Sequence, residues 1–399
     1  MRILIIGGDG YCGWASALHL AARNHDVTIL DSLVRRRWDC ELGVSTLTPI
    51  HSMTERLEAW ERQGERPIRF IEADAADYAA LCDAIVTTQP EAIVNFGQQR
   101  SAPYSMIDRD HAAATMINNS LCNLNVLWAM REFAPGAHLV KLGTMGEYGT
   151  PNIEIEEGFI TIEHKGRRDT LPFPKQPGSF YHLSKVADSD QIYFATRVWG
   201  LRATDLNQGV VYGVHTEETA RAPELINRFD YDGVFGTALN RFCVQAALGH
   251  PLTVYGRGGQ TRAFLNITDT VRCIELALQS PAPAGKFRVF NQFTQTFSVL
   301  NLARHVERVG KMLGLRVRID HVENPRVERE THFYSSLNTN LLALGLEPVL
   351  LTDEVVASMI ESARTFRSRI DGAQIMPKVR WKGLVRRSEL GFLDSERVG

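Results

Sequence analysis

The first 31 residues carry the pattern that most restricts the fold of this chain. Met1 to Ile6 is an apolar run that ends at Gly7, helical apolar spacing follows from Tyr11 to Arg23, and Asp26 to Leu30 is a second apolar run. This succession predicts a strand, a helix and a second strand. Because a helix connects the two strands, we expect them to lie parallel in one sheet.

The same alternation continues to residue 142. We expect further strands at Ile68 to Ile71, Ala92 to Phe96 and His138 to Leu142, with helices at Tyr78 to Val86 and Asp108 to Phe133. Strands that alternate with helices form a parallel sheet covered on both faces. The sequence therefore predicts an α/β fold, a doubly wound parallel sheet of the Rossmann type.

Residues 33–66 interrupt this alternation. They include a charged, helix-like segment around Thr54 to Arg62, which we expect to be an insertion rather than part of the repeating core. Arg35, Arg36 and Arg37 form the only basic run in the body of the chain, and we expect them on a solvated loop.

The alternation of strands and helices becomes less regular after Asn207, where short apolar runs and Gly-rich turns precede helical patterns near residues 270–278, 299–313 and 353–368. We expect a smaller C-terminal lobe here. The predicted Rossmann domain comprises residues 1–206 and 262–292, and the predicted substrate-binding lobe comprises residues 207–261 and 293–381. We expect residues 382–399, which carry charge and few apolar groups, to form a poorly ordered tail.

The composition excludes several classes of protein. A formal net charge of −2 gives no general attraction to nucleic acid or to an anionic membrane, and no run of 18 apolar residues predicts membrane insertion. The six cysteines are scattered without the spacing of a metal site, so we expect no metal and reduced thiols. These features predict a cytoplasmic protein, or one of the plastid stroma if a transit peptide has been removed.

The turn between the first strand and helix has the spacing of a dinucleotide site. Gly7, Gly10 and Gly13 form a GxxGxxG pattern, which lets backbone N–H groups approach a pyrophosphate. Asp31 closes the second strand, where a carboxylate accepts hydrogen bonds from the adenosine ribose and repels a 2′-phosphate. The sequence therefore predicts NAD rather than NADP. Asp74 follows the third strand and is expected either to meet the adenine or to cap a helix.

A second motif supplies acid–base groups. Tyr181 and Lys185 are four residues apart, so they share one face of a helix. We expect the ammonium group to stabilise the phenolate and to lower the pKa of Tyr181 toward neutrality. Thr144 ends a parallel strand, the place where open sheets bind ligands.

These motifs together resemble the extended short-chain dehydrogenase/reductase superfamily, whose members act on nucleotide sugars. The segments "GGDGYCGW", "FGQQRSAPYSMIDR", "KLGTMGEYGTPN", "YHLSK", "GGQTRAFLNITDTVRC" and "LGLEP" look like those of the UDP-sulfoquinovose synthase family, over residues 1–381. That resemblance implies NAD-dependent oxidation of UDP-glucose at C4 and elimination of the 6-hydroxyl to a 4-keto-5-ene. Sulfite then adds at C6, which forms a carbon–sulfur bond, and C4 is reduced again, to make a sulfolipid or sulfoglycan head group.

The resemblance also implies roles for the loop after Thr144. In related 4,6-dehydratases an Asp and a Glu follow the Thr directly, whereas this chain has Met145 and Gly146 and then Glu147. We expect Met145 to remove a proton donor near C6, although it also suits a core. We expect Glu147 to act as acid and base at C5 and C6, with an ion-pairing carboxylate as the alternative. His182 is expected either to assist proton transfer or to face solvent.

Substrate contacts are expected from topology and charge. Arg100 and Gln98 follow the fourth strand, near the nicotinamide end, and are expected near the sulfite because a guanidinium suits an anion. A structural ion pair is the alternative role of Arg100. Asn207, Arg262 and Arg326 are expected to bind the UDP moiety. The complete set of expected cofactor contacts is Gly7, Gly10, Tyr11, Cys12, Gly13, Asp31, Asp74, Tyr181 and Lys185.

Two other functions share these motifs. A UDP-sugar 4-epimerase or 4,6-dehydratase would use the same cofactor and the same Tyr and Lys, and a non-catalytic NAD-sensing protein would use the fold for binding alone. The resemblance further implies a homodimer joined through helices near residues 108–133 and 180–199. It leaves open whether free sulfite or a sulfite-donating protein supplies the sulfur.

Overall fold

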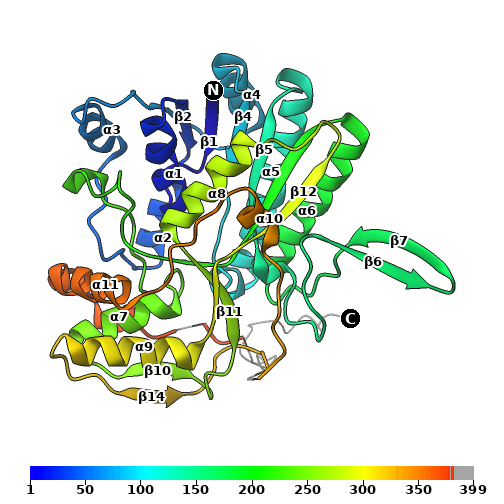
Figure 1. Ribbon diagram of the computed structural model, residues 1–399. Helices are drawn as coiled ribbons and strands as arrows, with labels where there is room; N and C mark the ends of the chain where they lie inside the picture. Colours follow the sequence, from blue (N-terminus) through cyan, green and yellow to red (C-terminus); the bar gives the residue numbers. More distant parts are fainter. Residues whose placement is uncertain (330, 378, 382–399) are drawn as a thin grey trace, which may run out of the picture.

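A seven-stranded parallel sheet organises the computed structural model, which describes residues 1–329, 331–377 and 379–381 (Figure 1). The strand order is β12-β8-β5-β4-β1-β2-β3, and every neighbouring pair runs parallel. The strands are β1 (Arg2–Ile6), β2 (Asp26–Asp31), β3 (Arg69–Glu72), β4 (Ala92–Asn95), β5 (His138–Thr144), β8 (Arg202–Gln208) and β12 (Phe287–Gln292). The predicted α/β, Rossmann-type fold is confirmed.

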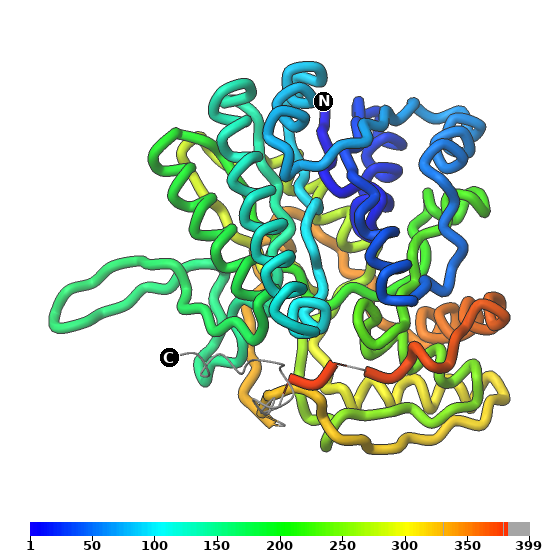
Figure 2. Tube along the Cα trace, turned by 180° about the vertical axis from the view of Figure 1, so that it is seen from behind, coloured from blue at the N-terminus to red at the C-terminus, as the bar shows by residue number. Residues whose placement is uncertain are grey.

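Helices cover both faces of this sheet. On one face α1 (Tyr11–Ala22) packs against α8 (Ile267–Gln279), and α10 (Thr339–Ala343) lies beside β12. On the other face α4 (Tyr78–Thr88), α5 (Arg109–Phe133) and α6 (Phe180–Trp199) pack side by side, as the view from behind in Figure 2 shows. Apolar side chains of β1 point alternately to the two faces, which buries one core cluster on each side of the sheet.

The insertion contains two helices, α2 (Val34–Glu41) and α3 (Met53–Glu61). The expectation of a solvated loop at Arg35, Arg36 and Arg37 was wrong, because these residues lie on α2. Arg37 is exposed, but Arg35 pairs with Asp39 and Arg36 pairs with Asp9 in the Gly-rich turn. Partners distant in sequence therefore hold this segment on the body of the protein.

The second lobe has its own core. A three-stranded sheet of order β13-β11-β9 and a parallel pair, β10 with β14, pack with three helices around buried apolar residues. Its elements are β9 (Val210–Tyr212), α7 (Ala238–Leu248), β10 (Leu252–Tyr255), β11 (Thr261–Asn266), β13 (Gln295–Ser298), α9 (Val299–Met312), β14 (Ile319–Val322) and α11 (Asp353–Thr365). The predicted domain boundaries at 206/207 and 261/262 fall near the end of β8 and the start of β11, and the division into two domains stays a prediction.

A hairpin of β6 (Phe159–His164) and β7 (Arg167–Pro172), which the sequence analysis did not predict, projects from the body in Figure 1. Short 3₁₀ helices complete the list: η1 (Tyr104–Met106), η2 (Met145–Glu147), η3 (Pro223–Leu225), η4 (Arg367–Arg369) and η5 (Gly372–Gln374).

Three further expectations concern the chain as a whole. All six cysteines are free thiols. Among the residues that the structure describes, none of the helices is long and apolar enough to span a membrane. The expected tail at 382–399 lies outside the described residues.

Candidate active site

The Gly-rich turn joins β1 to α1 at the carboxyl edge of the sheet. A Cβ added at Gly13 would lie 2.2 Å from the carbonyl oxygen of Gly7, so this close approach of backbone to helix requires glycine. Gly10 is the N-cap residue of α1. The turn therefore presents a helix N-terminus and backbone N–H groups, as a pyrophosphate requires.

Asp31 lies directly beside this turn. Its Oδ2 accepts a hydrogen bond of 2.8 Å from the N–H of Asp9, and its Oδ1 accepts one of 2.7 Å from the N–H of Leu33. The structure thus brings together the predicted pyrophosphate and ribose groups in the arrangement that a dinucleotide needs.

The remaining predicted cofactor residues make protein contacts of their own. The Tyr11 hydroxyl donates to the carbonyl of Gly213 at 2.6 Å, and Cys12 Sγ lies 3.8 Å from Gln208 Oε1, so both side chains tie α1 to the second half of the chain. Asp74 is exposed, and its Oδ1 accepts from the N–H of Ala76 at 2.9 Å. The alternative of a helix cap at Asp74 was wrong, because Asp77 is the N-cap residue of α4, and contact of Asp74 with the adenine stays a prediction.

Thr144, Tyr181 and Lys185 converge at the end of β5. The Tyr181 phenol hydrogen-bonds the side chain of Thr144, and Lys185 Nζ donates to the carbonyl of Leu142 at 2.8 Å. The N–H of Tyr181 donates to Ser105 Oγ at 3.0 Å, which fixes the start of α6 against the turn that precedes α5. The three residues that the two motifs predicted therefore form one site.

Burial dominates the acid–base properties of this site. It raises the pKa of Tyr181 to about 12, and it lowers the pKa of Lys185 to about 8 together with the nearby charge of Lys141. The sequence-based expectation that Tyr181 has a pKa near neutrality is therefore wrong for the protein alone, because removal from water costs the phenolate more than the surrounding cations return.

His182 packs against the loop that follows Thr144. A Cβ added at Gly146 would lie 2.3 Å from His182 Nε2, so the imidazole occupies the space that a side chain at position 146 would need. His182 Nδ1 lies 3.0 Å from Ser179 Oγ, the N-cap of α6. Burial and the charges of Arg326 and Arg262 lower the pKa of His182 to about 4, so the imidazole is neutral at pH 7.

Met145 precedes Gly146 and is buried. It packs in an apolar cluster with Tyr148, Ile155 and Phe173, so it serves at least as a core residue. Whether it also acts at C6 stays a prediction.

Glu147 belongs to a buried ion-pair network. Its side chain is 0% exposed, and its two oxygens lie 3.4 Å from Lys141 Nζ and 2.6 Å from Lys175 Nζ. Although burial acts in the opposite direction, the two ammonium groups hold the pKa of this carboxyl below its ordinary value. The ion-pairing alternative describes this geometry, and the expected role as acid and base at C5 and C6 stays a prediction.

The predicted substrate residues divide into two groups. Arg262 and Arg326 from the second lobe lie close enough to lower the pKa of His182, and Arg100 acts on Tyr181 in the same way. Gln98 and Asn207, in contrast, are engaged inside the protein. Gln98 accepts from Lys185 and donates to Asp188, and Asn207 is fully buried with its Nδ2 2.8 Å from the Tyr148 hydroxyl. Direct substrate contact by these two amides stays a prediction.

The sequence motifs did not predict the buried charged residues that contact the loop after Thr144. Lys141 on β5 lies opposite Asp205 on β8, and Lys141 Nζ is 3.2 Å from Asp205 Oδ2 in the sheet interior. Ser189 on α6 joins both groups to Glu147. A lysine inside an otherwise apolar strand was the available signal, because a buried charge needs a partner.

Comparisons with known proteins agree with this geometry. Residues 3–291 match the model of the NAD dependent epimerase/dehydratase family. The chain is 58% identical to the chloroplastic UDP-sulfoquinovose synthase of Spinacia oleracea, over 96% of this chain and 79% of that protein. It is 42% identical to the UDP-sulfoquinovose synthase of Sulfolobus acidocaldarius, over 96% of this chain and 98% of that protein.

The fold is also that of a solved nucleotide-sugar enzyme. A UDP-glucose-4-epimerase from Stenotrophomonas maltophila, with bound NAD and formylated UDP-arabinopyranose, superposes with a TM-score of 0.69 at 20% identity. The match covers 93% of this chain and 100% of that structure. With its Gly-rich turn, its Thr–Tyr–Lys site and this similarity over nearly its whole length, the chain belongs to the NAD-dependent epimerase/dehydratase family and, within it, to the UDP-sulfoquinovose synthase family.

Proposed function

We propose that this protein is a UDP-sulfoquinovose synthase, which uses NAD to convert UDP-glucose and sulfite into the 6-sulfonate. The single observation that carries this proposal is the sequence identity of 58%, over 96% of the chain, with a protein of that name. The site supports it, because Thr144, Tyr181 and Lys185 suit oxidation at C4 while Met145 and Gly146 stand where a dehydratase has its acids.

The first step needs a base at the C4 hydroxyl. Tyr181 takes this proton, and Thr144 holds first the hydroxyl oxygen and then the carbonyl oxygen. The Gly-rich turn and Asp31 would hold NAD, which when bound would supply a reversible hydride acceptor for C4. Because burial raises the pKa of Tyr181 to about 12, its phenolate depends on positive charge, which Lys141 and Arg100 supply in part and to which we expect Lys185 to contribute.

The second step needs a base at C5 and an acid for the 6-hydroxyl. We assign this work to His182, since its neutral imidazole lies against Gly146 and can accept a proton at pH 7. Glu147 serves instead as a positioning residue, which ties the loop after Thr144 to Lys141 and Lys175.

Both proposed substrates are anions, and the site contains arginines that can bind them. Arg262 and Arg326 are the proposed contacts of the UDP diphosphate, because guanidinium groups match phosphate oxygens. Arg100 is the proposed contact of sulfite. It pairs with Asp230 in the structure, so sulfite would compete with that carboxylate for the guanidinium.

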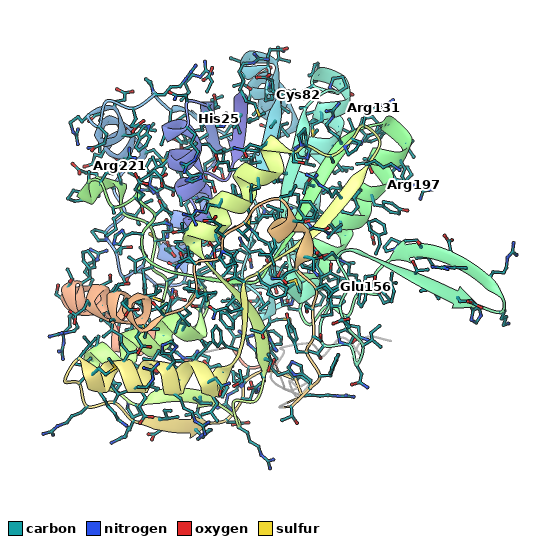
Figure 3. All side chains as sticks on the ribbon, in the orientation of Figure 1. His25, Cys82, Arg131, Glu156, Arg197 and Arg221 are labelled. Carbon is teal, nitrogen blue, oxygen red and sulfur yellow. The ribbon has the colours of Figure 1, made fainter. Side chains whose placement is uncertain are left out.

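We further propose a homodimer through α5 and α6. Ile117, Leu121, Leu124 and Trp128 are exposed along one side of α5, and Phe194 and Val198 are exposed on α6. Their outer faces form a contiguous region because the two helices pack together, and Arg131 and Arg197, labelled in Figure 3, lie on this same side of the molecule. An apolar surface of this kind marks a protein interface.

Sedimentation velocity tests the dimer. Ile117→Glu and Phe194→Glu place a charge in the proposed interface, since these side chains are 63% and 59% exposed, and each should yield monomers. Val86→Glu on α4 changes a side chain of similar exposure, 47%, outside the interface and should leave the dimer intact. A wild-type protein that sediments as a monomer at micromolar concentration would contradict the proposal.

Mass spectrometry of the product in D₂O tests the activity. Sulfite addition to a 4-keto-5-ene leaves a carbanion at C5 that takes a proton from the medium, so the product should carry sulfonate and one deuterium. A 4-epimerase would form a stereoisomer of the substrate without sulfur or deuterium, and a dehydratase would form a 4-keto-6-deoxy sugar. A non-catalytic NAD sensor would form no product. Reaction with free sulfite as the only sulfur source also decides whether a donor protein is required.

The compartment is the remaining proposal. The relative from Spinacia oleracea is chloroplastic, and for this chain we retain the prediction of a cytoplasmic or stromal location.

A further inference from the structure

An unusual carboxylate stands inside the Gly-rich turn. Asp9 is 1% exposed, and three guanidinium groups surround it. Arg36 Nε and Nη2 lie 2.8 and 2.7 Å from its two oxygens, Arg56 Nη1 lies 2.7 Å away, and Arg228 Nη2 lies 3.9 Å away. Arg36 and Arg56 come from the insertion between β2 and β3, so the insertion reaches the cofactor turn through this one side chain.

The position of Asp9 relates this cluster to the adenosine ribose. Its N–H donates to Asp31 Oδ2 at 2.8 Å, and Asp31 is the residue that closes β2 at the ribose position of a Rossmann site. Asp9 is therefore a direct neighbour of the residue that would face the 2′-hydroxyl of NAD or the 2′-phosphate of NADP.

Arginines at this position would ordinarily favour NADP. An arginine near the end of β2 accommodates the 2′-phosphate in NADP-dependent Rossmann proteins, because a guanidinium forms paired hydrogen bonds with phosphate oxygens. Arg36 is 27% exposed and so remains accessible to a ligand. In this chain, however, two of its N–H groups are already bound to Asp9, and that carboxylate offsets its charge.

Arg56 has further donors in reserve. Its guanidinium stacks on the Trp14 ring at 3.8 Å, and its Nε and Nη2 have no hydrogen-bond partner in the structure. Loss of the Asp9 charge would leave Arg36 and Arg56 as uncompensated positive charge beside the ribose position, whereas Arg228 would keep its ion pair with Asp39.

We propose that Asp9 is a second determinant of cofactor specificity, which neutralises Arg36 and Arg56 and so prevents them from binding the 2′-phosphate of NADP. Asp31 repels the phosphate directly, and Asp9 removes the cations that would attract it. This inference rests on NAD as the cofactor and not on the sugar chemistry proposed above.

Equilibrium binding to the cofactor-free protein tests it without any turnover. Calorimetric titration with NAD and with NADP gives the ratio of the two dissociation constants for the wild type, Asp31→Asn, Asp9→Asn and the double variant. We expect Asp31→Asn to retain at least about tenfold preference for NAD. Asp9→Asn should narrow the wild-type ratio by about tenfold, since a hydrogen bond to a charged group contributes roughly this much, and the double variant should bind both cofactors comparably.

Two controls separate this role from a general effect of charge. Asp39→Asn removes a carboxylate that pairs with Arg35 and Arg228 but does not contact Arg36 or Arg56, and it should leave the ratio unchanged. Arg36→Met added to the double variant should remove the acquired affinity for NADP.

The proposal fails if Asp31→Asn alone binds the two cofactors equally, or if folded Asp9→Asn keeps the wild-type ratio. The first result remains decisive should Asp9→Asn not fold, because Asp31→Asn leaves the whole Asp9 cluster in place. A wild-type protein that binds neither cofactor would instead refute the assignment of NAD, and an absence of sulfonate product would affect only the proposed function.

Discussion

A single methyl group at Gly146 should disable the proposed base. In Gly146→Ala the new Cβ would lie 2.3 Å from His182 Nε2 and 2.4 Å from its Cδ2. Because nonbonded atoms need about 3.5 Å, the imidazole must move by roughly 1 Å. A misplacement of this size costs about 10²-fold in rate, and a complete loss of general base catalysis costs about 10²- to 10⁴-fold. We therefore expect kcat to fall by about 10²-fold, or about 2.7 kcal/mol of transition-state stabilisation.

The assay measures sulfonate formation from UDP-glucose and sulfite by mass spectrometry, together with NAD binding and the thermal midpoint. Binding of NAD should not change, since the Gly-rich turn is untouched. Gly136→Ala is a matched control, because a Cβ at Gly136 meets no atom within 4 Å. It should keep wild-type turnover.

A double-variant cycle decides between a displaced imidazole and any other effect of the methyl group. In a His182→Ala background the new Cβ has no ring to meet, so Gly146→Ala should then cost little beyond His182→Ala alone. Additive losses would mean that the methyl group acts on the substrate or on the loop itself. Normal turnover in Gly146→Ala would remove His182 from the mechanism.

Three further outcomes follow from the structure. Tyr181→Phe should abolish turnover and leave NAD binding intact, and near-normal turnover would refute the role of Tyr181 at C4. Without sulfite, the protein should hold an unsaturated 4-keto sugar, with the substrate mass less two hydrogens and one water, and steady release of a 4-keto-6-deoxy sugar would contradict this. Burial lowers the pKa of His19, but hydrogen bonds to Glu218 and Glu275 raise it above its ordinary value overall. A raised pKa stabilises the folded state below the unfolded value of about 6.5, and this contribution is lost as pH rises through the folded value. The difference in urea midpoint between wild type and His19→Gln should therefore shrink with rising pH, and a constant difference would contradict the ion pairing.

The parts of the fold that the sequence predicted are those set by local pattern. Short apolar runs and helical spacing, with a Gly-rich turn between them, predicted the parallel sheet and placed Gly13, Asp31, Thr144 and Tyr181 at its carboxyl edge. Each of these positions follows from a strand end or a helix face, so no distant partner has to be known.

The contacts that the sequence did not predict join side chains that are far apart in sequence. Arg36 was expected in solvent, yet its partner Asp9 lies 27 residues earlier. Asn207 donates a hydrogen bond to the Tyr148 hydroxyl, 59 residues away in sequence, and its expected contact with the substrate stays a prediction. Spacing along one chain contains no information on such pairs. Lys141 is the instructive exception, since its place within an apolar strand already required a buried carboxylate.

The negative charge of sulfite gives a physical reason for the absence, in a synthase, of the Asp and Glu that a dehydratase has near C6. Sulfite is an anion, and a carboxylate beside C6 would repel it as it approached the carbon. In this chain Glu147 pairs with two lysines, Met145 is apolar, and the imidazole that contacts Gly146 is neutral at pH 7. A neutral base can still remove the C5 proton and pass it to the departing 6-hydroxyl, which leaves as water. The histidine is then neutral again and does not repel sulfite, whereas a carboxylate at that position would regain its negative charge before the anion arrives.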